Sequence, residues 1–415
     1  MKLVITFFLL FCLNILKADY GVSGADEALS FGGVNPANLG YVGSNNFTIQ
    51  LPSVKIYNSF LLKYYDRFAL NKENLLSKSE LDDMIDMAEY GWRWKENYNI
   101  NLFTFNNDIF KISLYTNSLA DLNLPVDLLK IARGYDYNEQ YKFDDYGLEI
   151  CHYVGLDYSQ SFNLDNFFSV SSIGLDDAYA GFTIKGLYSP RYYRAEGISG
   201  VISVNDIENG STIDLDAVVE VFDSFGGIGG GFDFGISGFI NDNLSIGVSL
   251  NNIATFIIFF QDNNLDRFGL VTHDYLDFSE FDNDSIITAT EIDENIKEES
   301  RTIFLPMELN ASFGYNYDSY IGDLLLLANY RQGFEDRLMV STTPEISGGA
   351  YYTPEKLDWL TIKCGFSAGG NDRFRLSNGV SFYMGFYSID FSIMHQPFGE
   401  DYKLTYISFA NSLYF

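Results

Sequence analysis

The sequence predicts an all-β protein, specifically a transmembrane antiparallel β-barrel of about 14 strands. Three features lead to this fold class: an aromatic-rich composition, a two-residue alternation of apolar and polar side chains, and an apolar leader. Aromatic residues make up 17% of the 415 residues, with 37 Phe and 30 Tyr, whereas Pro occurs only 8 times. Large rings are enriched in strands and Pro is depleted there.

The alternation is clearest over residues 244–250, where Leu244, Ile246 and Val248 share one face and Ser245 and Ser249 share the other. The same period of two runs through 307–315 and 360–366. The polar rows carry Gly, Ser, Thr, Asn and single charges, whereas the solvent face of a soluble sandwich usually carries more Lys, Arg and Glu. Apolar-out and polar-in alternation is typical of a membrane barrel, which must close because a sheet edge in lipid leaves backbone groups unpaired.

Composition and motif spacing exclude several classes of protein. So many large apolar rings exclude intrinsic disorder, and a formal charge of −30 excludes a generic nucleic-acid surface. The three histidines, His152, His273 and His395, lie far apart, and no spacing suits a zinc site, a nucleophile elbow or a nucleotide loop. We therefore expect no enzyme, no cofactor and no metal site.

The first residues have the pattern of a secretory signal peptide. A basic start is followed by a short apolar run, which predicts a cleaved signal over residues 1–18, ending at Ala18 or alternatively at Ala25. The longest other apolar run, 253–260, is too short for a spanning helix. These features predict export to the outer membrane of a Gram-negative-type bacterium, where the barrel would contact lipid.

Two helical islands and one acidic stretch interrupt the strand pattern of the expected barrel, which covers residues 47–415. The islands lie near 71–90, after a capping box at Ser79–Asp82, and near 122–132. They either fill one end of the barrel or form connections outside the lumen. The acidic stretch 261–301 predicts a non-strand loop, which either binds divalent cations or a basic partner, or is simply a solvated loop.

The end of the chain has an alternating strand with Phe409, Leu413 and Phe415 in its apolar positions. A last strand ending on Phe resembles the signal by which outer-membrane barrels are recognised by their assembly machinery. We expect these three residues to act as a barrel assembly signal.

Residues 29–40, with Asn35, Pro36 and Ala37 at their centre, resemble the Asn-Pro-Ala segment of FadL-type outer-membrane proteins. The stretches 229–235 and 243–252 are similar to a hairpin of the PorV/PorQ-like branch of that superfamily. The resemblance implies a barrel whose lumen holds an N-terminal plug, here residues 19–46, with Asn35, Pro36 and Ala37 as its motif.

For FadL relatives, the resemblance implies passive transport of hydrophobic small molecules through a lumen that is partly lined by apolar rings. Phe103, Phe105, Tyr153 and Tyr383 fall on polar rows and are the candidate lumen aromatics, unless they only pack against the plug. The alternative is a non-conducting structural or secretion-accessory barrel resembling PorV, with an exported cargo protein as its partner. A third possibility is a soluble extracellular β-protein.

Overall fold

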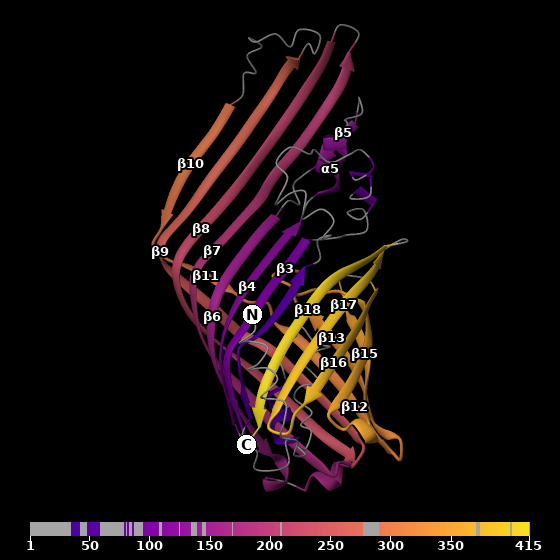
Figure 1. The fold of residues 1–415 in the computed structure, drawn as a ribbon. Helices are drawn as coiled ribbons and strands as arrows, with labels where there is room; N and C mark the ends of the chain where they lie inside the picture. The colour runs from indigo at the N-terminus through magenta and orange to yellow at the C-terminus, as the bar shows by residue number, and fades with distance from the viewer. Residues whose placement is uncertain are drawn as a thin grey trace, which may run out of the picture.

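The chain folds into a closed antiparallel β-barrel, seen in a computed structural model (Figure 1). The structure describes residues 35–41, 48–58, 79, 81–82, 85–86, 94–107, 110–123, 125–133, 139–142, 147–167, 169–207, 210–276, 290–370, 374–398 and 401–414. The expected signal peptide, the rest of the expected plug and Phe415 lie outside these residues.

Within the described residues, 14 strands form the wall, as the alternation predicted. They are β2 (Ser53–Asn58), β3 (Trp94–Asn106), β4 (Phe110–Asn123), β6 (Gly147–Asn163), β7 (Asp177–Ile207), β8 (Gly210–Asn241), β9 (Leu244–Leu276), β12 (Glu308–Ser319), β13 (Gly322–Gly333), β14 (Glu345–Pro354), β15 (Leu360–Gly369), β16 (Phe374–Tyr383), β17 (Tyr387–Phe398) and β18 (Asp401–Tyr414). Each pairs with its neighbours, and β18 pairs with β2, so the sheet has no free side.

Four short strands continue or flank this wall. β1 (Thr48–Gln50) extends β2 across Leu51 and Pro52, and it pairs with both β18 and β3. β10 (Thr290–Glu298) and β11 (Arg301–Phe304) run along β9 beyond the end of β12, and β5 (Glu139–Lys142) pairs with β7. The interruption at Pro52 follows from proline's missing N–H, which cannot join a ladder.

The helical elements whose bounds lie within the described residues are short. They are α5 (Val126–Arg133) and the 3₁₀ helices η1 (Pro36–Tyr41), η2 (Leu164–Asn166), η3 (Val170–Ile173) and η5 (Glu355–Leu357). α5 lies in the region of the island expected near 122–132, and the few described residues of the island expected near 71–90 are helical. None of the helices among the described residues is long and apolar enough to cross a membrane.

The two faces of the wall differ as the alternation predicted. On β9, Ile246 and Val248 are 40% and 51% exposed on the outer face, whereas Ser249 and Asn251 are buried on the lumen face. The outer face of the other strands is likewise rich in exposed Ile, Leu, Phe and Tyr. A closed wall with an apolar exterior and a polar interior is the arrangement that a bilayer requires, so the barrel spans a membrane.

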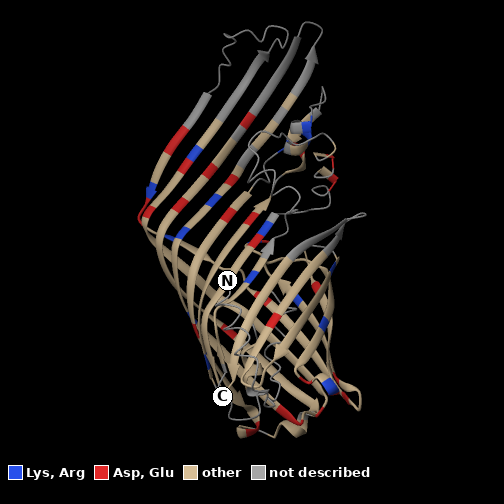
Figure 2. Cartoon of the chain, viewed as in Figure 1, with Lys and Arg blue, Asp and Glu red and all other residues tan. Residues whose placement is uncertain are grey.

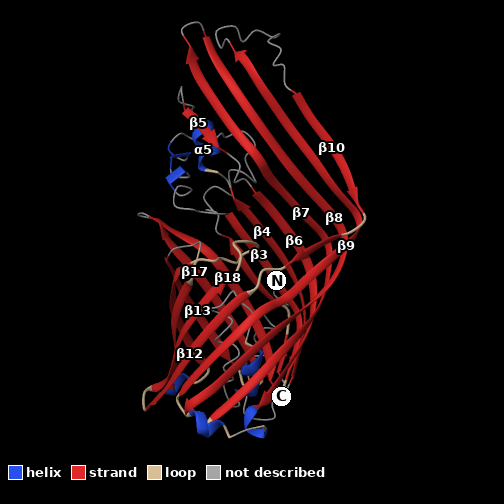
Figure 3. Ribbon diagram, turned by 180° about the vertical axis from the view of Figure 1, so that it is seen from behind, coloured by secondary structure: helices blue, strands red, loops and turns tan. Residues whose placement is uncertain are grey.

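Three strands continue far beyond the rest of the barrel (Figures 1 and 3). β7, β8 and β9 have 31, 32 and 33 residues, whereas about 9–11 residues suffice to cross a bilayer. We call their outer parts, residues 197–207, 210–223 and 263–276, together with β10, the extension. The opposite end, where tight turns join β8 to β9 and β12 to β13, is called the turn end.

The extension corrects the expected acidic loop. Residues 261–276 and 290–298 are strand rather than loop, and 277–289 lie outside the described residues. Charged residues gather on this sheet (Figure 2), where Arg267 forms ion pairs with Glu220 of β8 and Glu294 of β10. Cross-strand pairs of opposite charge stabilise such a sheet, which explains how an acidic sequence forms strands here.

A lysine in the lipid-facing part of the wall will destabilise the barrel more than a lysine in the extension. Ile184 is 54% exposed on the outer face, between Tyr158 of β6 and Phe232 of β8. We expect Ile184→Lys to lower the free energy of unfolding by about 2–4 kcal/mol, the cost of Lys near a bilayer midplane. Ile296→Lys, at a position 43% exposed in β10, is the matched control, with an expected change within about 0.5 kcal/mol. Equal effects of the two changes in denaturant titrations of the bilayer-embedded protein would contradict this assignment of faces.

Candidate functional site

The N-terminal segment lies inside the barrel near the turn end. The side-chain amide of Asn35 donates to the carbonyls of Ile236 on β8 (3.1 Å) and Val248 on β9 (3.4 Å). Its side-chain oxygen accepts from the backbone N–H of Ala37 at 3.0 Å, which fixes the start of η1. Pro36 occupies the first helical position, where its missing N–H does no harm. Asn35 and Ala37 are both buried.

Three glycines on neighbouring strands make room for this segment. A Cβ atom at Gly181 of β7 would lie 2.4 Å from the carbonyl carbon of Pro36, and one at Gly235 of β8 would lie 2.0 Å from Asn35 Oδ1. At Gly247 of β9 it would lie 2.9 Å from Asn35 Nδ2. The absence of side chains at these three positions therefore lets the segment approach the wall directly.

A second segment enters the lumen from the opposite wall. Residues 334–344, which connect β13 to β14, turn inward and are called the inward loop. Its Arg337 forms a bidentate ion pair with Glu149 of β6, with Nε 2.7 Å from Oε2 and Nη2 2.6 Å from Oε1. The hydroxyl of Tyr192 donates to the same carboxylate at 2.7 Å, and Lys95 of β3 donates to the carbonyl of Val340 at 3.3 Å.

The tip of the inward loop is held in an unfavourable backbone conformation. Leu338 and Met339 have φ values of 44° and 75°, in the left-handed region that non-glycine residues rarely adopt. Such conformations cost about 1–3 kcal/mol each and persist only where other contacts hold them. The ion pair of Arg337 and the burial of Leu338 supply those contacts.

Leu338 packs into a group of buried apolar side chains on the lumen side. The group, called the lumen apolar cluster, consists of Leu119, Cys151, Tyr153, Leu187, Tyr192, Ile257, Phe259, Ile303, Leu305 and Leu338. Within it, the rings of Tyr192 and Phe259 lie 5.7 Å apart. Apart from Leu338, its members belong to strands of the wall or, in the case of Ile303 and Leu305, to β11 and the residue that follows it. The lumen therefore carries an apolar surface that the inward loop covers.

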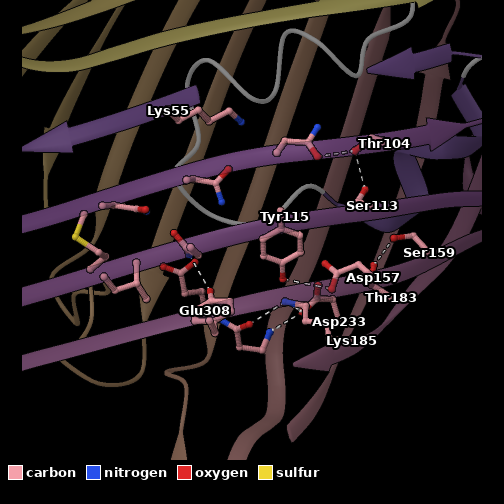
Figure 4. A pocket seen from close by; sticks show the side chains of 18 of the residues that line it. Lys55, Thr104, Ser113, Tyr115, Asp157, Ser159, Thr183, Lys185, Asp233 and Glu308 are labelled. Atoms are coloured by element: carbon pink, nitrogen blue, oxygen red, sulfur yellow. Dashed lines mark hydrogen bonds and ion pairs between the residues drawn. The ribbon is translucent and has the colours of Figure 1, made fainter. Parts of the chain in front are cut away.

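A polar cavity of about 280 Å³ lies between the two inner segments, bordered by Pro36 and Leu39 on one side and by residues 338–340 on the other. Six amide side chains line it, namely Gln50, Asn97, Asn99, Asn101, Asn117 and Asn252. Hydroxyl pairs add to this lining, because Thr104 donates to Ser113 at 3.0 Å and Ser159 lies 2.9 Å from Thr183 (Figure 4).

Two pairs of opposite charge lie in the lining of the cavity (Figure 4). Lys185 Nζ lies 2.8 Å from Asp233 Oδ1, and Arg331 Nε donates to Glu308 Oε1 at 2.8 Å. Tyr115 donates to Asp157 at 3.3 Å. Charges removed from bulk water need such partners, because an unpaired buried charge is strongly destabilising.

The wall is interrupted beside the apolar cluster. β11 ends at Phe304 and β12 begins at Glu308, while Asn252 and Ala254 of the facing β9 have φ values of 58° and 46°. Across this interval, Leu305 N–H donates to the carbonyl of Thr255 (2.9 Å), and the Asn252 side-chain amide donates to the carbonyl of Pro306 (3.1 Å). Because Pro306 has no N–H, the ladder is weaker here.

The predicted lumen aromatics separate into two groups. Tyr153 is buried and lines the cavity, and Tyr383 shares the lumen-side row of Ser381 at the turn end. Phe103 and Phe105 instead lie on the outer face, where Phe103 is 42% exposed and Phe105 contacts the ring of Phe110. The reason is a bulge between Asn101 and Phe103, because one extra residue moves every later side chain of β3 to the opposite face.

The expected assembly residues lie at the outer surface where they are described. Phe409 is 43% exposed and pairs with Phe391 of β17, which is 42% exposed. Leu413 is half-buried near the end of β18. Both lie on the last strand, next to the seam with β1 and β2.

The inward loop was not found from the sequence. Residues 323–352 carry only a weak strand signal there, and nothing in 334–344 indicates that the connection turns into the lumen. Its anchor, Glu149, is one of several single charges on polar rows. Among the described residues, no group of three or more His, Cys, Asp or Glu side chains could hold a metal ion.

The sequence matches no protein-family model and no curated protein. Solved structures do resemble the fold over nearly the whole chain. The toluene transporter TbuX of Ralstonia pickettii is 10% identical, with 94% of this chain and 96% of that chain covered and a TM-score of 0.45. The toluene transporter TodX of Pseudomonas putida is 10% identical, with coverage of 97% and 96% and a TM-score of 0.42. A FadL homologue of Pseudomonas aeruginosa is 13% identical, with coverage of 92% and 91% and a TM-score of 0.39. Similarities of this size say nothing about what this chain binds.

A methyl group at Gly181 will displace the N-terminal segment. Because the clash in Gly181→Ala is with backbone atoms of Pro36 and Ala37, which cannot rotate away, we expect a cost of about 1–3 kcal/mol. Amide hydrogen exchange of residues 35–41 should then be about tenfold faster or more.

Gly186→Ala on the same strand is the control, because its Cβ would meet only an ordinary contact at 3.7 Å. It should leave the exchange of residues 35–41 unchanged. Equal exchange rates in the two variants would show that the segment does not depend on Gly181.

Proposed function

We propose that this barrel passively transports hydrophobic small molecules across the outer membrane of a Gram-negative-type bacterium, in the manner of FadL relatives. The observation that carries the proposal is the lumen apolar cluster. The rest of the lumen face is polar, as expected where the interior meets water. An apolar surface inside it offers a site where a hydrophobic molecule gains about 25 cal/mol per Å² of apolar surface removed from water.

In this proposal, the inward loop is the gate. Leu338 occupies the apolar site in the closed state, so a ligand must displace it to bind. The strain at Leu338 and Met339 favours opening, and the ion pair of Arg337 with Glu149 opposes it. The two effects have similar magnitude, which allows a small population of the open state.

The exit in this proposal is through the wall. The N-terminal segment and its Asn35 anchor close the direct path at the turn end. The interruption between β11 and β12 lies beside the cluster, since Leu305 belongs to both. A hydrophobic molecule leaving there would pass directly into the lipid and would avoid the polar cavity.

The alternative of a non-conducting secretion-accessory barrel needs no apolar surface inside its lumen, so the cluster favours transport. Relation to the PorV/PorQ-like branch and recognition of Phe409, Leu413 and Phe415 by the assembly machinery stay predictions from the sequence. A cleaved signal peptide over residues 1–18 completes the proposed route to the outer membrane.

Loosening the ion pair of the inward loop will increase uptake. Arg337→Gln removes a charged bidentate partner of Glu149, and hydrogen bonds to charged groups contribute about 1.5–3 kcal/mol. We therefore expect uptake of radiolabelled decane into proteoliposomes to rise at least about tenfold.

Arg191→Gln is the matched control, because it removes a similar ion pair with Asp223 in which the Arg191 side chain is half exposed. Decane uptake by the Arg191→Gln variant should equal that of the unmodified chain. If hydrogen exchange shows the loop opened in Arg337→Gln and decane uptake still does not exceed that of empty liposomes, the transport proposal is wrong and the accessory role is favoured.

A further inference from the structure

The polar cavity and the lumen apolar cluster are parts of one continuous surface. Leu119, Tyr153 and Leu338 line the cavity and also belong to the cluster. A molecule that displaces Leu338 therefore contacts apolar side chains at one end and the amide-lined cavity at the other. This arrangement fits a ligand with two chemically different ends better than it fits a pure hydrocarbon.

We propose that the ligand is an amphiphile with an uncharged hydrogen-bond-donating head group, of the hydroxyl or amide class. The head group binds in the polar cavity and the apolar tail lies against the lumen apolar cluster. The inference rests on the proposed transport function and specifies the class of molecule transported.

Asn117 of β4 defines the head-group site most sharply. It is 8% exposed, and its side-chain N–H donates to the hydroxyl of Tyr153 at 2.8 Å. That bond orients the amide so that Oδ1 is the remaining acceptor, and among the described residues Oδ1 has no partner. A buried acceptor without a partner is unfavourable, so a ligand donor that reaches Oδ1 is bound selectively.

A second acceptor lies on the adjacent strand. Asn97 of β3 also lines the cavity, and its buried Oδ1 likewise has no partner among the described residues. Asn99 stands directly opposite Asn117 in the β3–β4 ladder, with Asn97 two positions along. Two neighbouring acceptors on one face of the wall fit a head group that carries more than one donor, such as a polyhydroxylated group.

The charges around the cavity disfavour ionic head groups. A carboxylate has only acceptors, so it cannot satisfy Asn117 Oδ1, and it would compete with Asp233 for Lys185 and with Glu308 for Arg331. An ammonium group would meet the four cationic side chains of the lining, Lys55, Lys111, Lys185 and Arg331, against only three carboxylates. Lys111 already interacts with Asp157, and Lys55 also has an interaction partner. A neutral donor avoids both conflicts.

The test compares probes that share an eight-carbon tail. Binding of radiolabelled octyl glucoside, octanoate, octylamine and octane, all far below micelle-forming concentrations, is measured on the full chain in nanodiscs, with empty nanodiscs subtracted. We expect octyl glucoside to bind about tenfold more tightly than octanoate or octylamine. In Asn117→Leu, we expect the affinity for octyl glucoside to fall about tenfold, which is the effect of losing one hydrogen bond to a buried acceptor. Binding of octane should not change in Asn117→Leu.

Asn310→Leu is the matched control. Asn310 is equally buried on the lumen side, and neither of its side-chain polar atoms has a partner among the described residues, but it does not line the cavity. The Asn310→Leu variant should therefore bind octyl glucoside as tightly as the unmodified chain does. If Asn117→Leu fails to assemble, as judged by heat-modifiable mobility, Asn97→Leu replaces it with the same expectation.

The outcomes separate the inference from the function on which it rests. Octane binding with no preference for the glucoside, a preference for octanoate or octylamine, or glucoside binding unaffected by Asn117→Leu overturns the head-group inference and leaves hydrophobic transport standing. Failure of all four probes to bind overturns both.

Discussion

The structure depends on one constraint, which is that every backbone N–H and C=O within a bilayer must find a partner in the protein. A sheet satisfies this only when its last strand pairs with its first, as β18 does with β1 and β2. Closure in turn creates an interior, and the alternation of side chains between bulges makes the two faces of each strand independent. The outer rows can then be apolar for lipid while the inner rows hold amides, hydroxyls and paired charges.

The same constraint decides where the wall can carry features of functional interest. Breaks in the ladder occur at Pro52 and around Pro306, and in both places a neighbouring side-chain amide bonds the carbonyl of the proline. Asn411 does this at the first break and Asn252 at the second. At each break, a side-chain amide of a neighbouring strand thus replaces part of the missing backbone pairing. Asn252, which lines the polar cavity, therefore has a structural task in the wall in addition to any role in binding.

The fold was predictable because alternation reports directly on the two environments of a strand. The barrel, its approximate strand number and the inner position of Tyr153 followed from that period of two. Phe103 and Phe105 were assigned to the wrong face because a single bulge near Asn101 reverses the period, and a sequence carries no mark of a bulge. The inward loop was missed because its position is fixed by contacts across the barrel, such as Arg337 with Glu149, which local patterns do not contain. Residues 261–276 and 290–298 were mistaken for a loop because their acidic sequence hides strands that cross-strand ion pairs, such as those of Arg267, help to stabilise.

The seam of the barrel bears on the order in which it forms. The pairing of β1 and β2 with β18 joins residues 48–57 to residues 406–414, so it closes a loop of almost the whole described chain. Loop-closure entropy opposes contacts between such distant residues more than it opposes hairpins. The seam is also short and interrupted at Pro52, so it adds few bonds once formed. We therefore expect folding to proceed from the hairpins toward the seam, with the pairing of β18 with β1 and β2 forming last.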